Sequence, residues 1–305
     1  MRIIPATLAV FVLACSSTTL TYAADIGFHK TLTASGPVAL NICSNSGLIH
    51  VAGVDGNTVQ ITATIHKTDW HEVGDGGEMK QVAAAPPVQQ TGNTIKIGNA
   101  TTCGAGVLKG IDIDYEISAP KNSTVFARDG AGAIHVESIS GYVRARTGKG
   151  DIMVNGIGAE SMLSTGSGNM DIQGAHGMLL ARTAAGDMTI ENSDISQSQF
   201  RVGTGNITGT GLKGGLQAST GNGSISLAGA PTSDWSMRTG NGTIHFAADT
   251  GAKFELDAET GMGTIDSTLP APLSGHVSDG VLRGPVRGGG PVVKMYTGSG
   301  NITLQ

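Results

Sequence analysis

A Gly-x-Gly motif recurs along residues 121–305 at a nearly constant interval, which constrains the fold more than any other feature. The first glycines of successive motifs are 18 to 21 residues apart, once two degenerate positions are counted. Chance does not produce so regular a series, so each interval is one structural repeat. The anchor positions are Gly130, Gly148, Gly166, Ala184, Gly203, Gly221, Gly240, Gly261, Gly280 and Gly298.

The residues around each motif alternate between apolar and polar. Apolar side chains stand four and six positions after the anchor, as at Ile152 and Val154, and at alternate positions before it, as at Val143 and Ala145. This period of two predicts at least two short strands per repeat, joined by a glycine turn. A third apolar slot, nine residues after the anchor, predicts a third short wall and holds Ile139, Ile157, Ala175 and Leu212.

Two topologies fit this pattern, an antiparallel meander and a parallel solenoid. The solenoid explains more, because like residues at like slots pack on their own copies one strand spacing away. We therefore predict an all-β chain that forms a parallel, β-helix-like solenoid of about ten coils of 18–19 residues. Residues 24–120 are less regular, although 45–51 resemble one more repeat, and we expect them to form strands, a long loop and an irregular N-terminal cap. The last repeat, ending at Gln305, is expected to close the other end.

The first 23 residues have the form of an export signal, with Arg2 followed by an apolar run too short to span a bilayer. Two processing routes remain open. One is cleavage after Ala23, and the other is lipidation of Cys15, which would supply a lipid anchor. No later segment is apolar enough to be transmembrane. We therefore expect a periplasmic, outer-membrane-associated or extracellular protein.

Either processing route leaves two cysteines, Cys43 and Cys103, in the mature chain. In an oxidising compartment this predicts a disulfide between them. Neither cysteine has a histidine in any recognisable motif, which argues against a cysteine nucleophile.

Composition and missing motifs narrow the function. The net charge of −5 provides no basic excess for nucleic-acid binding. The chain has no nucleophile elbow, P-loop, dinucleotide fingerprint or His-Glu-x-x-His motif, and nothing in it implies a cofactor or metal. We expect no enzymatic activity.

The tandem pattern Thr-Gly-x-Gly-(Asp/Asn/Ser/Thr)-Ile-x-(Val/Ile/Leu), as in residues 147–154, resembles that of the bacterial putative adhesin family. The strand Asp114-Tyr115-Glu116-Ile117, which ends at Pro120, is also similar to that family. The resemblance covers roughly residues 28–305. It implies an exported β-helix-like domain and surface adhesion, and it brings no catalytic residues.

Four arginines share one outward slot, two residues before the anchor: Arg146, Arg182, Arg201 and Arg238. Arg182 and Arg201 are expected on adjacent coils. One interpretation is a stripe that grips acidic polysaccharide or lipopolysaccharide. The other is a set of solvated side chains that pair with nearby carboxylates, namely Asp151, Asp171 and Asp187.

Other polar groups have simpler explanations. The residue after each Gly-x-Gly, such as Asp151, is expected to join a hydrogen-bonded ladder rather than a calcium site. Asp112, Asp114 and Glu116 alternate along one strand, and we read them as its solvated face rather than as a Ca²⁺ or acid–base site. Trp70 could stack on a sugar ring or plug the end of the solenoid. Three histidines occupy the same slot of different repeats. We expect their coils to be far apart, so that they cannot form one site: His50, His135 and His245.

The resulting hypothesis is an exported, non-enzymatic binding or structural module that contacts polysaccharide or another envelope component. One alternative is a polysaccharide lyase or hydrolase, for which Arg182, Arg201, Asp171 and Asp187 would have to converge. Another alternative is an envelope scaffold or sensor with a protein partner.

Overall fold

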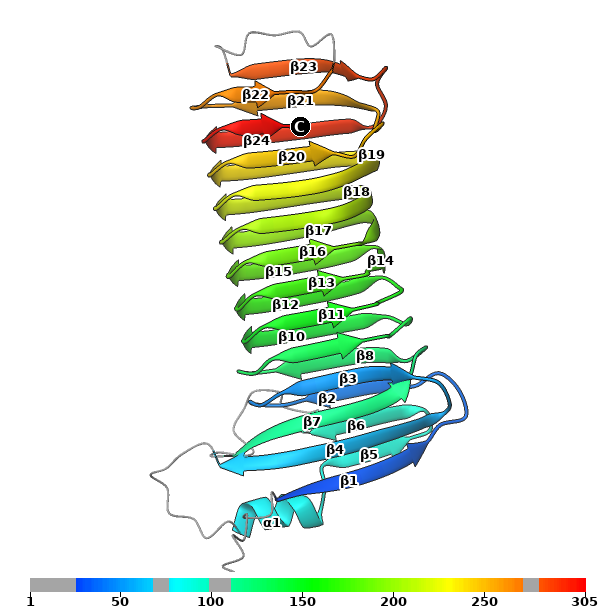
Figure 1. Cartoon of the computed structure of the whole chain (residues 1–305). Coiled ribbons are helices and arrows are strands. Elements are labelled where there is room, and N and C mark those ends of the chain that lie inside the picture. The colour runs from blue at the N-terminus through cyan, green and yellow to red at the C-terminus, as the bar shows by residue number, and fades with distance from the viewer. Residues whose placement is uncertain (1–25, 68–76, 99–110, 271–279) are drawn as a thin grey trace, which may run out of the picture.

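The computed structural model describes residues 26–67, 77–98, 111–270 and 280–305. These residues form a rod of stacked strands, with one short helix, α1 (Gly77–Ala84), near its N-terminal end (Figure 1). The described strands belong to one hydrogen-bonded sheet that winds around a single apolar core. The chain is therefore an all-β protein with a solenoid-like shape.

We call the stack of strands that precede the glycine corner of each repeat wall A. Its neighbouring strands run parallel, and equivalent positions of successive repeats are register partners, as Ala145 and Leu163 are. β17, β18 and β19 are long because each continues around a corner from one wall to the next. Along the rod, wall A consists of β6 (Thr94–Gly98), β2 (Ala39–Cys43), β8 (Thr124–Asp129), β10 (Val143–Lys149), β12 (Ser161–Ser167), β15 (Leu179–Ala185), the ends of β17 (Asp194–Thr204), β18 (Ile207–Asn222) and β19 (Ile225–Asn241), β24 (Val292–Ser299) and β21 (Phe254–Thr260).

Wall B is the stack that follows the glycine corner, and its strands are also parallel to one another. A short third wall begins where β14 (His176–Gly177) pairs with the start of β17. Along the rod, wall B consists of β7 (Ile111–Pro120), β3 (Ile49–Val54), β9 (Ile134–Glu137), β11 (Ile152–Asn155), β13 (Met170–Gln173), β16 (Met188–Glu191), the starts of β18 and β19, β20 (Ile244–Ala248), β25 (Ile302–Leu304) and β22 (Ile265–Ser267).

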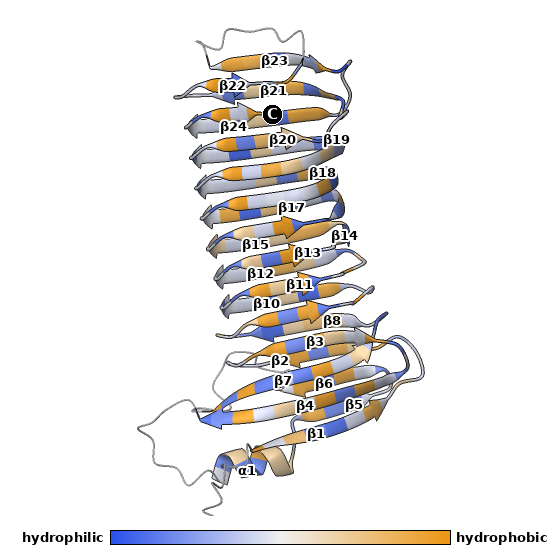
Figure 2. Ribbon diagram, in the orientation of Figure 1, coloured by the Kyte–Doolittle hydropathy of each residue, from blue (hydrophilic) through white to orange (hydrophobic). Residues whose placement is uncertain are grey.

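The core lies between the walls and is built from the apolar slots of the repeat. Met188, Ile207 and Ile225 are register partners on successive wall B strands, and each is fully buried. Figure 2 shows the resulting alternation of apolar and polar residues along each strand. The third slot is buried as well, as predicted for Ile139, Ile157, Ala175 and Leu212.

The glycine corner is as tight as the motif predicts. Gly168 has a φ of 152°, and a Cβ placed there would lie 2.1 Å from the carbonyl oxygen of Gly150 on the preceding coil. Beside this corner, the buried hydroxyl of Thr165 donates to the same carbonyl at 2.9 Å, and the same bond recurs from Thr147 to Gly132. The threonines therefore satisfy backbone groups that the bend exposes inside the rod.

The first coil of the chain lies inside the rod rather than at its tip. β2 pairs with both β6 and β8, and β3 pairs with both β7 and β9. This segment carries the apolar residues of the repeat, because Ile49 and Val51 occupy the slots of Ile134 and Val136. It therefore stacks on the first regular coil, while strands from before and after it in the sequence form the N-terminal end.

The C-terminal end has the same interleaved order, so the expectation that the final strands close the rod is wrong. β24 lies between β19 and β21, and β25 lies between β20 and β22. The coil that ends at Leu304 keeps every apolar slot, whereas β22 has Ser267 in the corresponding place. The more complete repeat is the one buried between two neighbours.

Antiparallel strands lie beyond the parallel stacks. β1 (Ile26–Thr33) pairs with β4 (Thr58–Lys67), and β4 pairs with β7. β5 (Val88–Thr91) pairs with β6, and β23 (Val281–Val286) pairs with β21. A search of the described residues finds no helix of sufficient length and apolarity for a bilayer crossing.

Candidate functional site

The predicted arginine stripe is a continuous row on the outer face of wall A. Arg182 and Arg201 are register partners on adjacent strands, as expected. Ser164 separates Arg146 from Arg182, and Ser219 separates Arg201 from Arg238. The sequence analysis missed one member, although it stands two residues before the anchor Gly130. We call the complete set the arginine row: Arg128, Arg146, Arg182, Arg201 and Arg238.

The arginine row is exposed and lacks acidic partners in the described part of the chain. On the strands from β10 to β24, Asp194 lies at the start of β17 on the third wall, and Asp234 accepts the N–H of Val292 at 2.8 Å. The row takes part in none of the ion pairs formed by described residues. Arg238 instead lies over the ring of Tyr296, with its guanidinium carbon 4.7 Å from the ring centroid. A shallow hollow of about 210 Å³ lies between Arg146, Arg182 and Arg201.

The expected pairing of these arginines with carboxylates is wrong, because the carboxylates lie elsewhere. Asp171 stands on the outer face of wall B, across the core from the arginines. At the corner, the Asp151 carboxylate accepts the amide N–H of Asn169 at 2.7 Å, and that of Asp187 accepts the N–H of Asn206 at 2.7 Å. The predicted polar ladder is therefore confirmed, and the convergence that a lyase or hydrolase would need is not formed by these residues.

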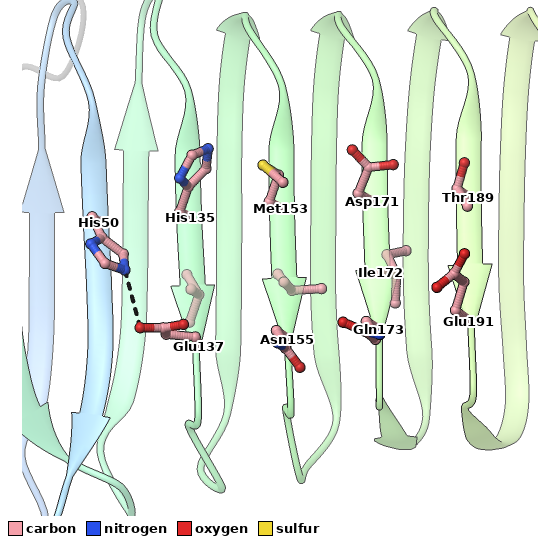
Figure 3. Close-up of a pocket in the computed structure, with 12 residues that line it drawn as sticks. His50, His135, Glu137, Met153, Asn155, Asp171, Ile172, Gln173, Thr189 and Glu191 are labelled. Atoms are coloured by element: carbon pink, nitrogen blue, oxygen red, sulfur yellow. Dashed lines mark ion pairs between the residues drawn. The ribbon is translucent and has the colours of Figure 1, made fainter.

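Wall B carries a second hollow, of about 410 Å³, over β3, β9, β11, β13 and β16 (Figure 3). It has two outward rows at its surface. One row contains His50, His135, Met153, Asp171 and Thr189. The other contains Glu137, Asn155, Gln173 and Glu191.

The histidines of this hollow correct a second expectation. His50 and His135 are neighbours, with ring centroids 6.2 Å apart, because β3 is interleaved beside β9. His50 Nε2 lies 3.4 Å from Glu137 Oε1. Burial and the adjacent His50 lower the pKa of His135, so His135 is neutral at pH 7. His245 pairs with other strands and lies far along the rod.

The acidic strand β7 is engaged in local contacts. Asp114 accepts the amide N–H of Leu48 at 2.7 Å and lies 3.0 Å from His66 Nε2. Asp112 accepts a hydrogen bond from the hydroxyl of Ser46. Within the described ranges, no group of three His, Cys, Asp or Glu side chains is arranged to hold a metal ion.

Asp129 is a buried carboxyl that the sequence analysis did not single out. It occupies the slot that threonine fills in the next repeat, as its register partner Thr147 shows. Its Oδ1 accepts the N–H of Ala131 at 2.8 Å, whereas its Oδ2 has no partner among the described residues. Burial, and to a smaller extent Asp112 and Asp114, raises the pKa of Asp129 to about 6.

We expect Asp129→Thr to raise the free energy of unfolding at pH 7 by about 2–3 kcal/mol, the equivalent of about two pKa units. The unfolded carboxyl loses its proton near pH 4 and the folded one near pH 6. Wild-type stability therefore falls as pH rises through this window, while the variant lacks this loss. Denaturant unfolding of both proteins at pH 4.5 and pH 7 measures this difference in stability. The reciprocal Thr147→Asp should introduce the same loss, and an equal effect of Asp129→Thr at both pH values would contradict the assignment.

Several candidate residues fall outside the described part of the chain, namely the leader 1–23 with Cys15, Trp70 and Cys103. Cys43 is described, and it lies buried at the end of β2. The disulfide between Cys43 and Cys103 thus stays a prediction.

Reduction should lower the stability of the folded chain by about 2–4 kcal/mol if this disulfide closes the intervening loop. Thermal unfolding with and without reductant measures the effect. Cys43→Ala/Cys103→Ala, which removes both thiols, should match the reduced protein and be insensitive to reductant. Detection of two free thiols by mass labelling of the unreduced protein would disprove the pairing.

The sequence of the repeats matches that of a known family. The sequence profile of Toastrack DUF4097 matches residues 88–305. The chain belongs to this family. The resemblance to the bacterial putative adhesin family is thereby confirmed. The Toastrack match begins at β5 and includes the arginine row and most of the wall B hollow.

Solved structures similar to this Toastrack protein span nearly the same length. A putative adhesin from Bacteroides fragilis is 12% identical, with 92% of this chain and 97% of that chain covered and a TM-score of 0.40. A putative lipid binding protein from Parabacteroides distasonis is 12% identical, with 92% and 96% covered and a TM-score of 0.46. A putative adhesin from the same species is 8% identical, with 92% and 98% covered and a TM-score of 0.42. The chain matches no curated protein sequence.

Proposed function

We propose that this protein is an exported, non-enzymatic binding module that holds an anionic polysaccharide of the cell envelope along wall A. The observation that carries the proposal is the arginine row, five guanidinium groups in strand register without acidic partners among the described residues. A guanidinium group binds carboxylate, sulfate or phosphate through two parallel hydrogen bonds. The row therefore suits a ligand that carries such groups at intervals.

The spacing of the row favours a polymer over a small molecule. Strands are about 4.8 Å apart, so adjacent arginines such as Arg182 and Arg201 are one such step apart and those separated by a serine are two steps apart. Each exposed contact is weak by itself. Several contacts on one chain of sugars add up through effective concentration, and binding is then strong and sensitive to salt.

We expect Arg182→Gln/Arg201→Gln to reduce retention on alginate or chondroitin sulfate at least tenfold without changing the melting temperature. Retention on neutral dextran should be negligible for both proteins. The control Lys121→Gln/Lys213→Gln removes the same charge from other exposed positions and should bind as wild type does. Undiminished binding by the arginine variant would reject the row as the site, and release of shortened products would favour a polysaccharide-cleaving enzyme.

A further inference from the structure

The two long walls carry opposite charges on their outer faces. Wall A has the arginine row, and from β10 to β24 the acidic residue nearest to it, Asp234, accepts the N–H of Val292 at 2.8 Å, whereas the terminal strand β21 carries Glu255, Asp257 and Glu259. Wall B has no lysine or arginine on its described strands from β3 to β22, and carries Glu137, Asp171 and Glu191 around the hollow in Figure 3. Along the strands that carry the arginine row and the hollow, the rod is therefore basic on one side and acidic on the other, and each side is an outer face of the same sheet.

The charges on the two walls follow the same spacing. Along wall A, Arg182 lies two strands beyond Arg146, and Arg201 lies one strand further. Along wall B, Asp171 lies two strands beyond Glu137, and Glu191 lies one strand further. Both series therefore advance by about 10 Å and then by about 5 Å along the rod.

The two series can also come within reach of each other across the walls. The arginines stand two residues before the glycine corner, and Asp171 stands near the start of its wall B strand, five residues after the first position of the corner. Glu137 and Glu191 end their strands two residues further on, about 7 Å, a distance that a long arginine side chain can cover. A second rod laid flat on the first, without rotation, thus brings its arginines over the carboxylates. The neutral His135 adds no positive charge to oppose them. Met153, 44% exposed in the middle of the hollow, offers apolar surface to the arginine stems.

We propose that wall A of a second copy of this chain docks on wall B, with the two rods parallel and offset by one strand. Arg146 then faces Glu137, Arg182 faces Asp171, and Arg201 faces Glu191. The contact joins different surfaces of the two copies, so a third copy adds in the same way and the rods assemble side by side. This inference stands on the charge pattern and not on polysaccharide binding, although an anionic polymer would compete for the same arginines.

Charge reversal on each wall tests this contact. Arg182→Glu/Arg201→Glu alters wall A, and Asp171→Lys/Glu191→Lys alters wall B, in each case at exposed positions. By sedimentation velocity, the wild-type chain should associate at low salt and dissociate at high salt. Each variant alone should associate at least tenfold more weakly, since like charges then face each other, and an equimolar mixture of the two should associate again.

Three results would overturn the proposal. They are a monomeric wild-type chain at low salt and high concentration, association unaffected by either reversal, and a mixture that stays monomeric although both variants melt as the wild type does. Lys121→Glu/Lys213→Glu is the control for charge change at other sites and should leave association intact. The wall B variant keeps every arginine, so its retention on alginate reports the proposed function separately from association.

Discussion

We expect Ile207→Asp to unfold the rod at neutral pH, because it should lower the free energy of unfolding by more than about 5 kcal/mol. Ile207 has no exposed surface and lies between Met188 and Ile225 on the neighbouring coils. Removing its side chain from the core costs about 2–3 kcal/mol. A carboxylate in the same place has no partner, and an unpaired buried charge costs several kcal/mol more.

Urea unfolding followed by circular dichroism measures this loss. The matched control is Thr208→Asp, the next residue on the same strand, which is exposed on wall B. It introduces the same charge and should change stability by less than about 0.5 kcal/mol. A normal unfolding curve for Ile207→Asp would refute the inward register of wall B.

Gly168→Ala should lower the free energy of unfolding by more than about 4 kcal/mol. The added Cβ would meet the Gly150 carbonyl oxygen at 2.1 Å, and this backbone atom is held by the next coil. The φ of 152° at Gly168 adds strain for any residue with a side chain. Relief requires the coils to separate at this corner, which breaks the stacking that buries the core.

Gly166→Ala, at the first glycine of the same motif, is the control for this prediction. Gly166 does not have a positive φ, and Ala184 occupies the corresponding position one repeat later. A Cβ at Gly166 would lie 2.5 Å from the Gly148 carbonyl oxygen, a less severe contact, and the Ala184 coil shows that the corner adapts to a methyl group there. We therefore expect a loss below about 2 kcal/mol. Thermal and urea unfolding of both variants provide the comparison, and equal losses would show that positive φ and the short contact at Gly168 do not matter.

Local patterns explain why much of the fold was predictable. The apolar slots of Ile152 and Val154, with the glycines beside them, define the corner and the wall B strand of one coil. Parallel stacking follows because each coil repeats this pattern. The arginine row was predictable for the same reason, since a fixed slot becomes a fixed line on the rod. Arg128 was missed although the same rule identifies it.

Features that depend on the order of coils were not predictable from the repeat. His50 and His135 meet because a segment near the start of the chain stacks beside β9, and their separation in sequence gives no sign of it. The buried slot of Asp129 was predictable, since it stands directly before the anchor Gly130, where the next repeat has Thr147. The smaller contribution of Asp112 and Asp114 to its pKa was not, because these residues come from β7 across this junction. The opposite charges of the walls also required the register of the strands.

The interleaving of β24 between β19 and β21 has a mechanical consequence. Tension applied at Gln305 must first shear β25 from β20 and β22 at once, and then β24 from β19 and β21, along ladders of hydrogen bonds that run the length of each strand. A coil stacked last would instead peel away from one neighbour. β2 is held in the same way between β6 and β8 at the other end. A strand held between two neighbours in this manner resists unwinding when the chain is pulled.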